Sequence, residues 1–246
     1  MVIFQAAASV GAMTISIILP TYCERDNIGS LLDSLENVLL PMGKEAEILV
    51  VDDNSPDGTA LVVQARPQKD GVRVECIVRT QERGLATAIK YGIQCASGEC
   101  ILVMDTDFNH SPTNIPQMIQ LLDDFDLVIG SRFVKGGGME DKKRYIYSLL
   151  YNLFVQLILW QPVRDNLSGF FAMRRGALIS MDMDDIFQGY GEYFMRLIHA
   201  AQRRRLSIRE VPVFYVLRQH GASKSRFGSM LRDYTRCLLS LRFEKA

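Results

Sequence analysis

Two aspartates separated by one residue, Asp105 and Asp107, directly follow an apolar stretch at residues 100–104. Residues two apart in an extended chain point to the same side, so both carboxylates can reach one point beyond the end of a strand. Such close negative charges repel unless a cation lies between them or one takes a proton. A hard divalent cation such as Mg²⁺ or Mn²⁺ binds carboxylate oxygens and often carries substrate phosphates as well. The pair indicates a metal site, although a strand that ends in solvated, helix-capping aspartates has the same pattern.

Polar residues also follow two other apolar stretches. Asp52 and Asp53 come after residues 47–51, and Arg132 comes after residues 126–130. In a parallel sheet with helices between its strands, ligands bind outside the carboxyl ends of the strands. If these stretches are parallel strands, the three side chains lie at the same edge as the aspartate pair. That convergence favours a binding site over solvated strand ends.

The elements that must position these residues alternate along the first half of the chain. Apolar stretches predict strands, and apolar residues at helical spacing or turn residues that open a periodic segment predict helices. Strands are predicted at 14–19, 47–51, 72–78, 100–104 and 126–130, with helices at 28–39, 84–96 and 112–122 and a short helix after the turn at 54–59. This alternation is typical of an α/β protein with a mostly parallel central sheet flanked by helices.

The second half of the chain is less regular. We expect a loop or hinge at residues 136–138, a helix at 142–160 and a polar turn at 165–169 that enters a strand. A helix at 192–205 and an extended stretch at 206–217 follow, and Pro212 favours an edge strand there. Residues 218–224 read as a basic loop, and residues 225–246 as a basic amphipathic helix. Such a helix can pack on the domain or lie on an anionic membrane.

Composition is that of a globular protein, with 48% apolar and 23% charged residues among 246. Residues 1–130 hold 8 Lys or Arg and 18 Asp or Glu, whereas residues 131–246 hold 20 and 10. An acidic half suited to a metal is therefore followed by a basic half suited to phosphates or an anionic membrane. Five cysteines without a C-x-x-C pair predict reduced, buried thiols in a cytoplasmic protein.

The chain ends and apolar runs bear on membranes. Residues 1–13 are apolar without a preceding Lys or Arg, so we interpret them as a dispensable N-terminal extension and not as a signal peptide. No run of about 18 apolar residues predicts a transmembrane helix. The main domain is then expected at residues 14–224, with residues 225–246 as a separate C-terminal helix.

Eight segments in order resemble the dolichol-phosphate (polyprenol-phosphate) mannose synthase branch of the family 2 glycosyltransferases. The resemblance runs from Ile15 to about Lys224, and its order makes it specific although each segment is weak alone. The segments are Pro20-Thr21-Tyr22-x-Glu24, Val50-Val51-Asp52-Asp53-x-Ser55-x-Asp57-Gly58-Thr59, Gly84-Leu85, Met104-Asp105-x-Asp107, Ile129-Gly130-Ser131-Arg132, Val163-Arg164-Asp165-x-x-Ser168-Gly169-Phe170, Glu210-Val211-Pro212-Val213 and Gly221-x-Ser223-Lys224.

The resemblance implies a Rossmann-like GT-A nucleotide-sugar-binding domain and an inverting, metal-dependent transfer, most simply of mannose from GDP-mannose to a polyprenyl or dolichyl phosphate. It implies Mg²⁺ or Mn²⁺ on Asp105, Asp107 and Asn109, with Arg132 as a further catalytic residue. The implied nucleotide-sugar residues are Pro20, Tyr22, Glu24, Asp52, Asp53, Asp105, Thr106 and Asp107. The implied phosphate or acceptor residues are Arg132, Arg144, Ser168, Arg218, Ser223 and Lys224.

The same resemblance implies where the protein works. Its partners would be a nucleotide sugar and a lipid phosphate, not nucleic acid. A lipid acceptor implies a cytoplasmic protein peripheral to a membrane's cytosolic face, reached through the membrane surface itself or a membrane-anchored partner subunit. The chain departs from the family pattern at Cys23, at residues 106–111 and at Leu167.

Alternatives to this interpretation remain open. The same fold could use another nucleotide sugar such as UDP-glucose, or a hydroxyl acceptor. The chain could also be a non-catalytic sugar-nucleotide-binding subunit, although such a protein has no need of the paired aspartates. A dinucleotide oxidoreductase is disfavoured because residues 20–22 are Pro-Thr-Tyr, where a glycine-rich turn is needed. His110 could bind a metal, but its place before a helix favours hydrogen bonding or capping.

Overall fold

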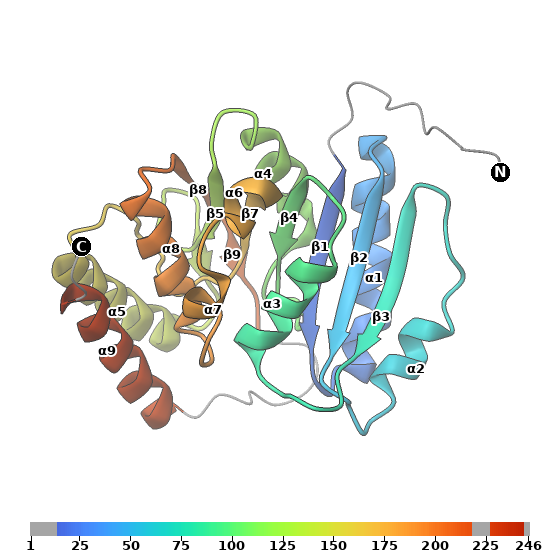
Figure 1. The fold of residues 1–246 in the computed structure, drawn as a ribbon, viewed down its shortest axis with the longest axis horizontal. Helices are drawn as coiled ribbons and strands as arrows, with labels where there is room; N and C mark the ends of the chain where they lie inside the picture. The colour runs from blue at the N-terminus through green and yellow to red at the C-terminus, as the bar shows by residue number, and fades with distance from the viewer. Residues whose placement is uncertain (1–13, 218–226, 244–246) are drawn as a thin grey trace.

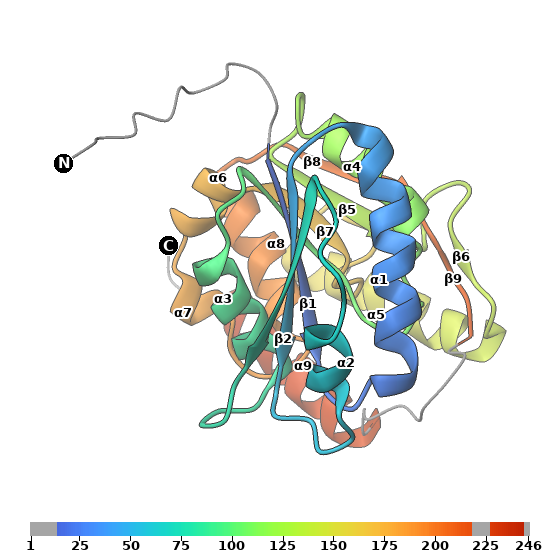
Figure 2. The same cartoon turned by 90° about the vertical axis from the view of Figure 1, so that its right-hand side faces the viewer.

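A seven-stranded sheet runs through the protein, with helices on both faces (Figures 1 and 2). The computed structural model describes residues 14–217 and 227–243. The strand order is β3-β2-β1-β4-β7-β5-β8. The strands are β1 (Ile15–Thr21), β2 (Ala46–Asp52), β3 (Val72–Val78), β4 (Cys100–Val103), β5 (Leu127–Ser131), β7 (Phe171–Arg174) and β8 (Ile208–Pro212).

The sheet is mostly parallel, as predicted. Strand β7 is the exception, since it runs antiparallel to β4 and β5 on either side of it. Strands β1, β2, β4 and β5 are buried at every position, which explains their continuous apolar runs. Strand β8 lies at one edge, which confirms the edge strand predicted from Pro212.

Helices cover both faces of the sheet. The helices are α1 (Arg25–Leu39), α2 (Thr59–Gln64), α3 (Leu85–Cys95), α4 (Ile115–Leu121), α5 (Lys142–Leu159), α6 (Arg175–Ile179), α7 (Met183–Ile186), α8 (Tyr193–Arg203) and α9 (Phe227–Phe243), with 3₁₀ turns at Leu40–Met42 and Pro112–Asn114. Helices α1 and α4 pack on one face, and α3, α7 and α8 pack on the other (Figure 2). The short helices α6 and α7 were not predicted.

Helices α5, α8 and α9 lie together beyond the sheet (Figure 1), and a third apolar cluster joins them. Its buried members are Val155, Met195, Tyr234, Cys237, Leu238 and Leu241. Helix α9 therefore packs on its neighbours through one face, which was one of the two outcomes expected for the basic C-terminal helix. Among the described residues, no helix is long and apolar enough to cross a membrane.

The glycines at 136–138, predicted as a loop or hinge, are held in place. Gly138 begins a short strand, β6 (Gly138–Met139), which pairs with β9 (Phe214–Tyr215) in a second, two-stranded sheet. A Cβ atom on Gly137 would lie 2.5 Å from the Ser131 carbonyl oxygen. The glycines therefore allow two backbone segments to approach closely. The single extended stretch predicted at 206–217 is divided in the structure into β8 and β9.

The cysteines are all free, but the prediction that they are buried is only partly right. Cys100 and Cys237 are buried, Cys23 and Cys76 are half-buried, and Cys95 is exposed. Cys95 is the last residue of α3, and its side chain is exposed at that end of the helix although the apolar run around it suggested burial.

Candidate active site

A cavity of about 1290 Å³ lies at the carboxyl edge of the sheet. Its polar part is formed by residues that follow β1, β2, β4 and β5, and its apolar part by side chains of α5 and α9. Of the residues predicted for the site, those that line it are Pro20, Tyr22, Glu24, Asp53, Asp105, Thr106, Asp107, Asn109, Arg132, Arg144 and Ser168. Asp52 does not line it, and Arg218, Ser223 and Lys224 lie outside the described residues.

The loops at this edge contain three non-glycine residues with left-handed backbone conformations. Cys23 follows β1 with φ of 53°, Asn54 follows β2 with φ of 55°, and Phe108 follows β4 with φ of 64°. A side chain at positive φ costs free energy, and such residues gather at binding and catalytic sites. Local backbone preference therefore does not explain the conformations of these three loops, and their strain is typical of a functional site.

The aspartate pair follows β4 as predicted. The Asp105 side chain is 44% exposed, and Asp107 is buried at the cavity wall. Asp107 Oδ1 accepts a hydrogen bond from the Asn109 backbone N–H (3.1 Å), and its Oδ2 accepts one from Asn109 Nδ2 (2.6 Å). Asn109 thus fixes the Asp107 carboxylate and keeps its own carbonyl oxygen as a further hard donor.

These residues fit a hard divalent cation, because two carboxylates and an amide oxygen line one cavity. Residues 14–217 and 227–243 contain no group of three or more His, Cys, Asp or Glu side chains arranged to hold a metal. A cation at Asp105 and Asp107 would therefore need oxygens from a bound substrate to complete its ligands. Diphosphate oxygens are the usual partners of Mg²⁺ in such sites.

His110 lies beneath the pair and is fully buried. Its Nδ1 accepts a hydrogen bond from the Asp105 backbone N–H (2.9 Å), and its Nε2 lies 2.8 Å from the Tyr215 hydroxyl. Burial lowers the pKa of His110 to about 4, although Asp107 acts in the opposite direction, so the ring is neutral at pH 7. Both ring nitrogens are engaged, which agrees with the expected hydrogen-bonding role and leaves no lone pair for a metal.

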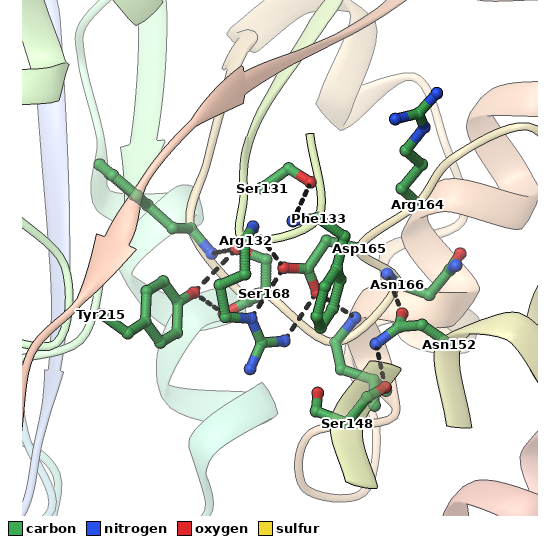
Figure 3. A network of polar contacts seen from close by, with 12 residues as sticks. Ser131, Arg132, Phe133, Ser148, Asn152, Arg164, Asp165, Asn166, Ser168 and Tyr215 are labelled. Carbon is green, nitrogen blue, oxygen red and sulfur yellow. Dashed lines mark hydrogen bonds and ion pairs between the residues drawn. The ribbon is translucent and has the colours of Figure 1, made fainter. Parts of the chain in front are cut away.

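Arg132 is predicted to bind phosphate, but the structure pairs it with a buried partner (Figure 3). Its Nε and Nη2 donate to the two oxygens of Asp165 at 2.8 and 2.7 Å, and its backbone N–H donates to the same carboxylate. Burial disfavours the charged guanidinium, yet the ion pair with Asp165 raises the pKa of Arg132. The guanidinium also lies 4.7 Å from the centre of the Tyr215 ring.

This pairing changes what Arg132 can do. Its charge is neutralised by Asp165, and within the described residues only Nη1 is left without a hydrogen bond where the side chain lines the cavity. Asp165 is itself fixed, because Glu210 accepts hydrogen bonds from the backbone N–H groups of Arg164 and Asp165 at 3.0 Å each. Asp165 and Glu210 lie in the segments that resemble the family, but no role was predicted for them. Sequence spacing alone does not show which strand ends lie next to each other.

The acidic residues after β2 are also internally bound. Asp52 is fully buried, and its carboxylate accepts from the Ser55 backbone N–H (2.9 Å) and hydroxyl. Asp53 accepts from Arg79 Nε (2.7 Å) and from the Gly84 backbone N–H (2.8 Å). These two carboxylates shape the loops around the cavity, and of the two only Asp53 reaches its surface.

One aromatic side chain faces a cation at the cavity rim near β1. Arg83 lies over the Tyr22 ring, 5.2 Å from its centre. A planar group could enter this stack. Arg83 was missed from the sequence because it is one of several charged residues in an irregular loop, with no periodic signal.

The basic residues at the start of α5 also line the cavity. Asp141 caps the helix by accepting from the Arg144 backbone N–H (3.0 Å), and the side chains of Lys143 and Arg144 line the wall. Ser168 lines it too, but its hydroxyl donates to the Gly130 carbonyl oxygen at 2.5 Å. Lys143 and Arg144 therefore add positive charge to the cavity that the aspartates also line.

The apolar part of the cavity lies between α5 and α9. Its side chains include Tyr147, Leu150, Tyr151, Phe154, Met230, Leu231 and Tyr234. The exposed side of α5 beside it is also apolar, with Leu157 71% exposed and Trp160, just after the helix, 82% exposed. A cavity lined by carboxylates and basic side chains and also by apolar side chains suits a ligand that has a charged part and an apolar part.

Comparison with known proteins adds to this geometry. A family model described as glycosyl transferase family 2 matches residues 16–181. A dolichol-phosphate mannosyltransferase from Pyrococcus furiosus is 35% identical over 234 residues, which cover 93% of this chain and 64% of that protein. One from Saccharomyces cerevisiae is 33% identical over 92% of this chain and 86% of that protein. The chain thus spans less than two thirds of the length of the Pyrococcus protein.

A solved structure has the same fold. The crystal structure of glucosyl-3-phosphoglycerate synthase from Mycobacterium tuberculosis, in complex with Mn²⁺, uridine diphosphate and phosphoglyceric acid, superposes with a TM-score of 0.71. The two chains are 22% identical, and the match covers 95% of this chain and 80% of that one. This likeness bears on the fold alone.

Proposed function

Because this chain belongs to glycosyl transferase family 2 and has the GT-A fold that was predicted for it, we propose that it transfers mannose from GDP-mannose to a polyprenyl phosphate. The single observation that carries this proposal is the composition of the cavity. Paired aspartates that follow β4 line the cavity, together with basic side chains at the start of α5 and apolar side chains of α5 and α9. The relatives named dolichol-phosphate mannosyltransferases support the choice of sugar and acceptor.

The metal would be held by Asp105 and Asp107, with Asn109 as a third oxygen donor. When bound, Mg²⁺ or Mn²⁺ supplies a Lewis acid that neutralises charge on the leaving nucleoside diphosphate. The nucleoside would lie against Pro20, Tyr22 and Glu24, with Asp53 at the surface beside them and Asp52 acting from beneath through the Ser55 loop.

The acceptor end would use the basic side chains. An oxygen of the acceptor phosphate forms a bond to the anomeric carbon as the carbon–oxygen bond to the diphosphate breaks, and the electron pair leaves with the nucleoside diphosphate. The acceptor is already an anion at pH 7, so no general base is required. Lys143 and Arg144 attract that phosphate, and Arg132 offers its remaining N–H. Arg218, Ser223 and Lys224 stay candidates for the same task.

We also infer that the protein works at a membrane's cytosolic face as a peripheral protein. A polyprenyl chain stays in the bilayer, and the exposed apolar side of α5 beside the cavity is suited to the lipid surface. Its members, Ile146, Leu150, Leu153 and Leu157, recur every three or four residues and so form one stripe. Free cysteines accord with a reducing compartment.

An acceptor panel tests the proposed function. The protein is incubated with radiolabelled GDP-mannose and Mn²⁺, with polyprenyl phosphate, the matching polyprenol or no acceptor in detergent micelles. We expect label in the lipid fraction only with the phosphate and only before EDTA is added. Equal transfer to the polyprenol, or transfer only from UDP-glucose, would contradict the proposal.

A hydroxyl acceptor is the second candidate, because one buried carboxylate adjoins the cavity lining in sequence although it does not itself line the cavity. Glu192 lies between the cavity residues Gly191 and Tyr193, and its Oε2 is buried with no hydrogen-bond partner among the described residues. A hydroxyl acceptor needs a base within hydrogen-bond reach, whereas a phosphate does not. Glu192→Gln should therefore retain most turnover if the acceptor is a phosphate. A loss of several orders of magnitude in a folded variant would favour the hydroxyl acceptor.

A further inference from the structure

A buried chain of hydrogen bonds holds the loop that carries the aspartate pair. The Asp105 backbone N–H donates to His110 Nδ1 at 2.9 Å, and His110 Nε2 lies 2.8 Å from the Tyr215 hydroxyl oxygen. That oxygen lies 3.1 Å from the Ser168 carbonyl oxygen. The chain therefore joins the loop after β4 to β9 and to the segment that enters β7.

The chemistry of its two ends fixes where each proton lies. A backbone N–H can only donate, so His110 Nδ1 must be the unprotonated nitrogen and Nε2 carries the proton. A carbonyl oxygen can only accept, so the Tyr215 hydroxyl donates to Ser168 and accepts from His110. The Tyr215 hydroxyl thus supports this tautomer from outside the metal loop, beside the Ser168 carbonyl oxygen.

Packing keeps both rings in place. His110 stacks on Phe170 with ring centres 4.8 Å apart and planes inclined by 11°, and Tyr215 meets its edge at 4.9 Å. Tyr215 is held in turn by the pairing of β9 with β6, where it lies opposite Met139. Neither ring can turn freely, so the hydroxyl is presented to Nε2 in one direction.

We propose that Tyr215 is a positioning residue for the metal loop: its hydroxyl holds His110 in the Nε2-protonated tautomer, and His110 then holds the Asp105 backbone. The proposal rests on the proposed function for what the loop binds. Groups of this kind, one step removed from a metal ligand, orient that ligand and affect metal affinity.

A competing acceptor gives the hydroxyl a second effect. His110 Nε2 lies 3.9 Å from Asp105 Oδ2, too far for a hydrogen bond but near enough to form one after a small shift. Without the Tyr215 hydroxyl, the Nε2–H keeps the Ser168 carbonyl oxygen as an acceptor, and the Asp105 carboxylate becomes a competing one. To the extent that Asp105 accepts this proton, it would be drawn toward the histidine and away from a cation in the cavity.

Tyr215→Phe tests this directly, because the ring and its contact with Arg132 stay while the hydroxyl is lost. Mn²⁺ binding is followed by the EPR signal of free Mn²⁺ in the presence of saturating GDP. We expect Mn²⁺ to bind about 10-fold more weakly than to the wild-type protein. Affinity for GDP without metal should stay within about twofold, since the change acts on the metal loop.

Two further variants separate positioning from general loss of stability. Ser16→Ala removes a buried hydroxyl that donates to Glu47 at 2.5 Å, at the opposite end of β1, and should leave Mn²⁺ affinity unchanged despite a lower Tm. His110→Asn keeps an acceptor for the Asp105 N–H but does not reach Tyr215. In that background Tyr215→Phe should have no additional effect on Mn²⁺ affinity, because the two groups act through one path.

Long-range ¹H–¹⁵N spectra of the histidine ring supply a readout that needs no metal. The wild-type protein should show His110 protonated at Nε2. Protonation at Nδ1, unchanged Mn²⁺ affinity in folded Tyr215→Phe, or an equal loss in Ser16→Ala would each overturn the inference while leaving the proposed function intact. Failure of the wild-type protein to bind Mn²⁺ with GDP would overturn both.

Discussion

At the scale of single residues, Asp105 and Asp107 have different surroundings. Asp107 is buried and fixed by Asn109, whereas Asp105 exposes much of its side chain to the cavity and is held through its backbone. A metal site built in this way has one rigid and one adjustable carboxylate. The difference predicts that changes at Asp105 affect chemistry with little effect on folding.

Asp105→Asn should lower kcat/KM by about a thousandfold at saturating Mn²⁺, since several kcal/mol of charge neutralisation depend on the carboxylates. Its Tm should match the wild-type value, because the side chain is partly exposed and the backbone contact to His110 remains. Asp124→Asn, at an exposed position, is the matched control and should retain activity. Retention of wild-type turnover in Asp105→Asn would argue against the metal site.

The buried pair of Arg132 and Asp165 makes the opposite prediction, a large effect on stability. Asp165→Asn keeps the shape but leaves the guanidinium without its counter-charge, so the free energy of unfolding should fall by about 3–5 kcal/mol. Urea denaturation measures this change. Asp233→Asn removes exposed pairs with Arg232 and Arg236 and should cost less than about 1 kcal/mol. Equal effects of the two changes would show that the buried pair is not an anchor.

At the scale of elements, the regular part of the fold could be predicted and the irregular part could not. Continuous apolar runs identify β1, β2, β4 and β5, because strands buried on both faces need them at every position. The residues that follow those strands were therefore placed at the correct edge. The strand after the turn at 165–169 was predicted and is β7, but its antiparallel direction was not, since a four-residue strand carries no signal of its direction.

The rest of the site depends on contacts between segments far apart in sequence. The pairing of Arg132 with Asp165, and of His110 with Tyr215, joins residues more than thirty and one hundred positions apart. Spacing rules act within one strand or helix and say nothing about such meetings. The short pairing of β6 with β9 was missed for the same reason, and its glycines resembled those of a loop.

Strand β2 begins with a charge that should make stability depend on pH. Burial alone would raise the pKa of Glu47, but hydrogen bonds from Ser16, Ser97 and Arg73 lower it to about 2. A carboxylate whose pKa falls on folding stabilises the protein above its unfolded pKa of about 4.5. This contribution should therefore be lost as the pH falls from about 4.5 to 2.

Glu47→Gln isolates that contribution. The difference in unfolding free energy between the variant and the wild-type protein should be constant above pH 5 and shrink steadily toward pH 2. Urea denaturation at a series of pH values measures it. A difference that does not change with pH would mean that the hydrogen bonds, and not the charge, stabilise this end of the strand.

Helix α5 predicts a membrane contact. Leu157→Glu places a charge in its exposed apolar stripe and should lower binding to anionic vesicles by about tenfold, since burying one such leucine is worth about 1.5–3 kcal/mol. Leu61→Glu on α2 is a matched control, because Leu61 is 70% exposed and helix α2 lies far from α5 (Figure 1). Sedimentation with vesicles compares the two, and an equal loss in both would contradict a specific membrane face.

At the scale of the whole molecule, the opposite charges of the two halves meet in one cavity. The first half supplies Glu24, Asp53, Asp105 and Asp107, and the second supplies Lys143, Arg144 and the apolar walls. The net charge of the whole chain, which is zero, does not reveal this division of charge between the two halves. The division follows the order of the elements along the chain. The sheet edge therefore presents oxygens for a metal and its diphosphate, and the later helices present groups for a charged lipid.

The most direct test of the account is the chemical structure of the product. The protein is supplied with GDP-mannose, polyprenyl phosphate and Mn²⁺, and the lipid product is isolated and examined by ¹H and ³¹P NMR. We expect a mannosyl phosphodiester in the β configuration, because one in-line displacement inverts the α-linked donor. An α-linked product, or mannose joined to a hydroxyl with no bond to phosphorus, would contradict it.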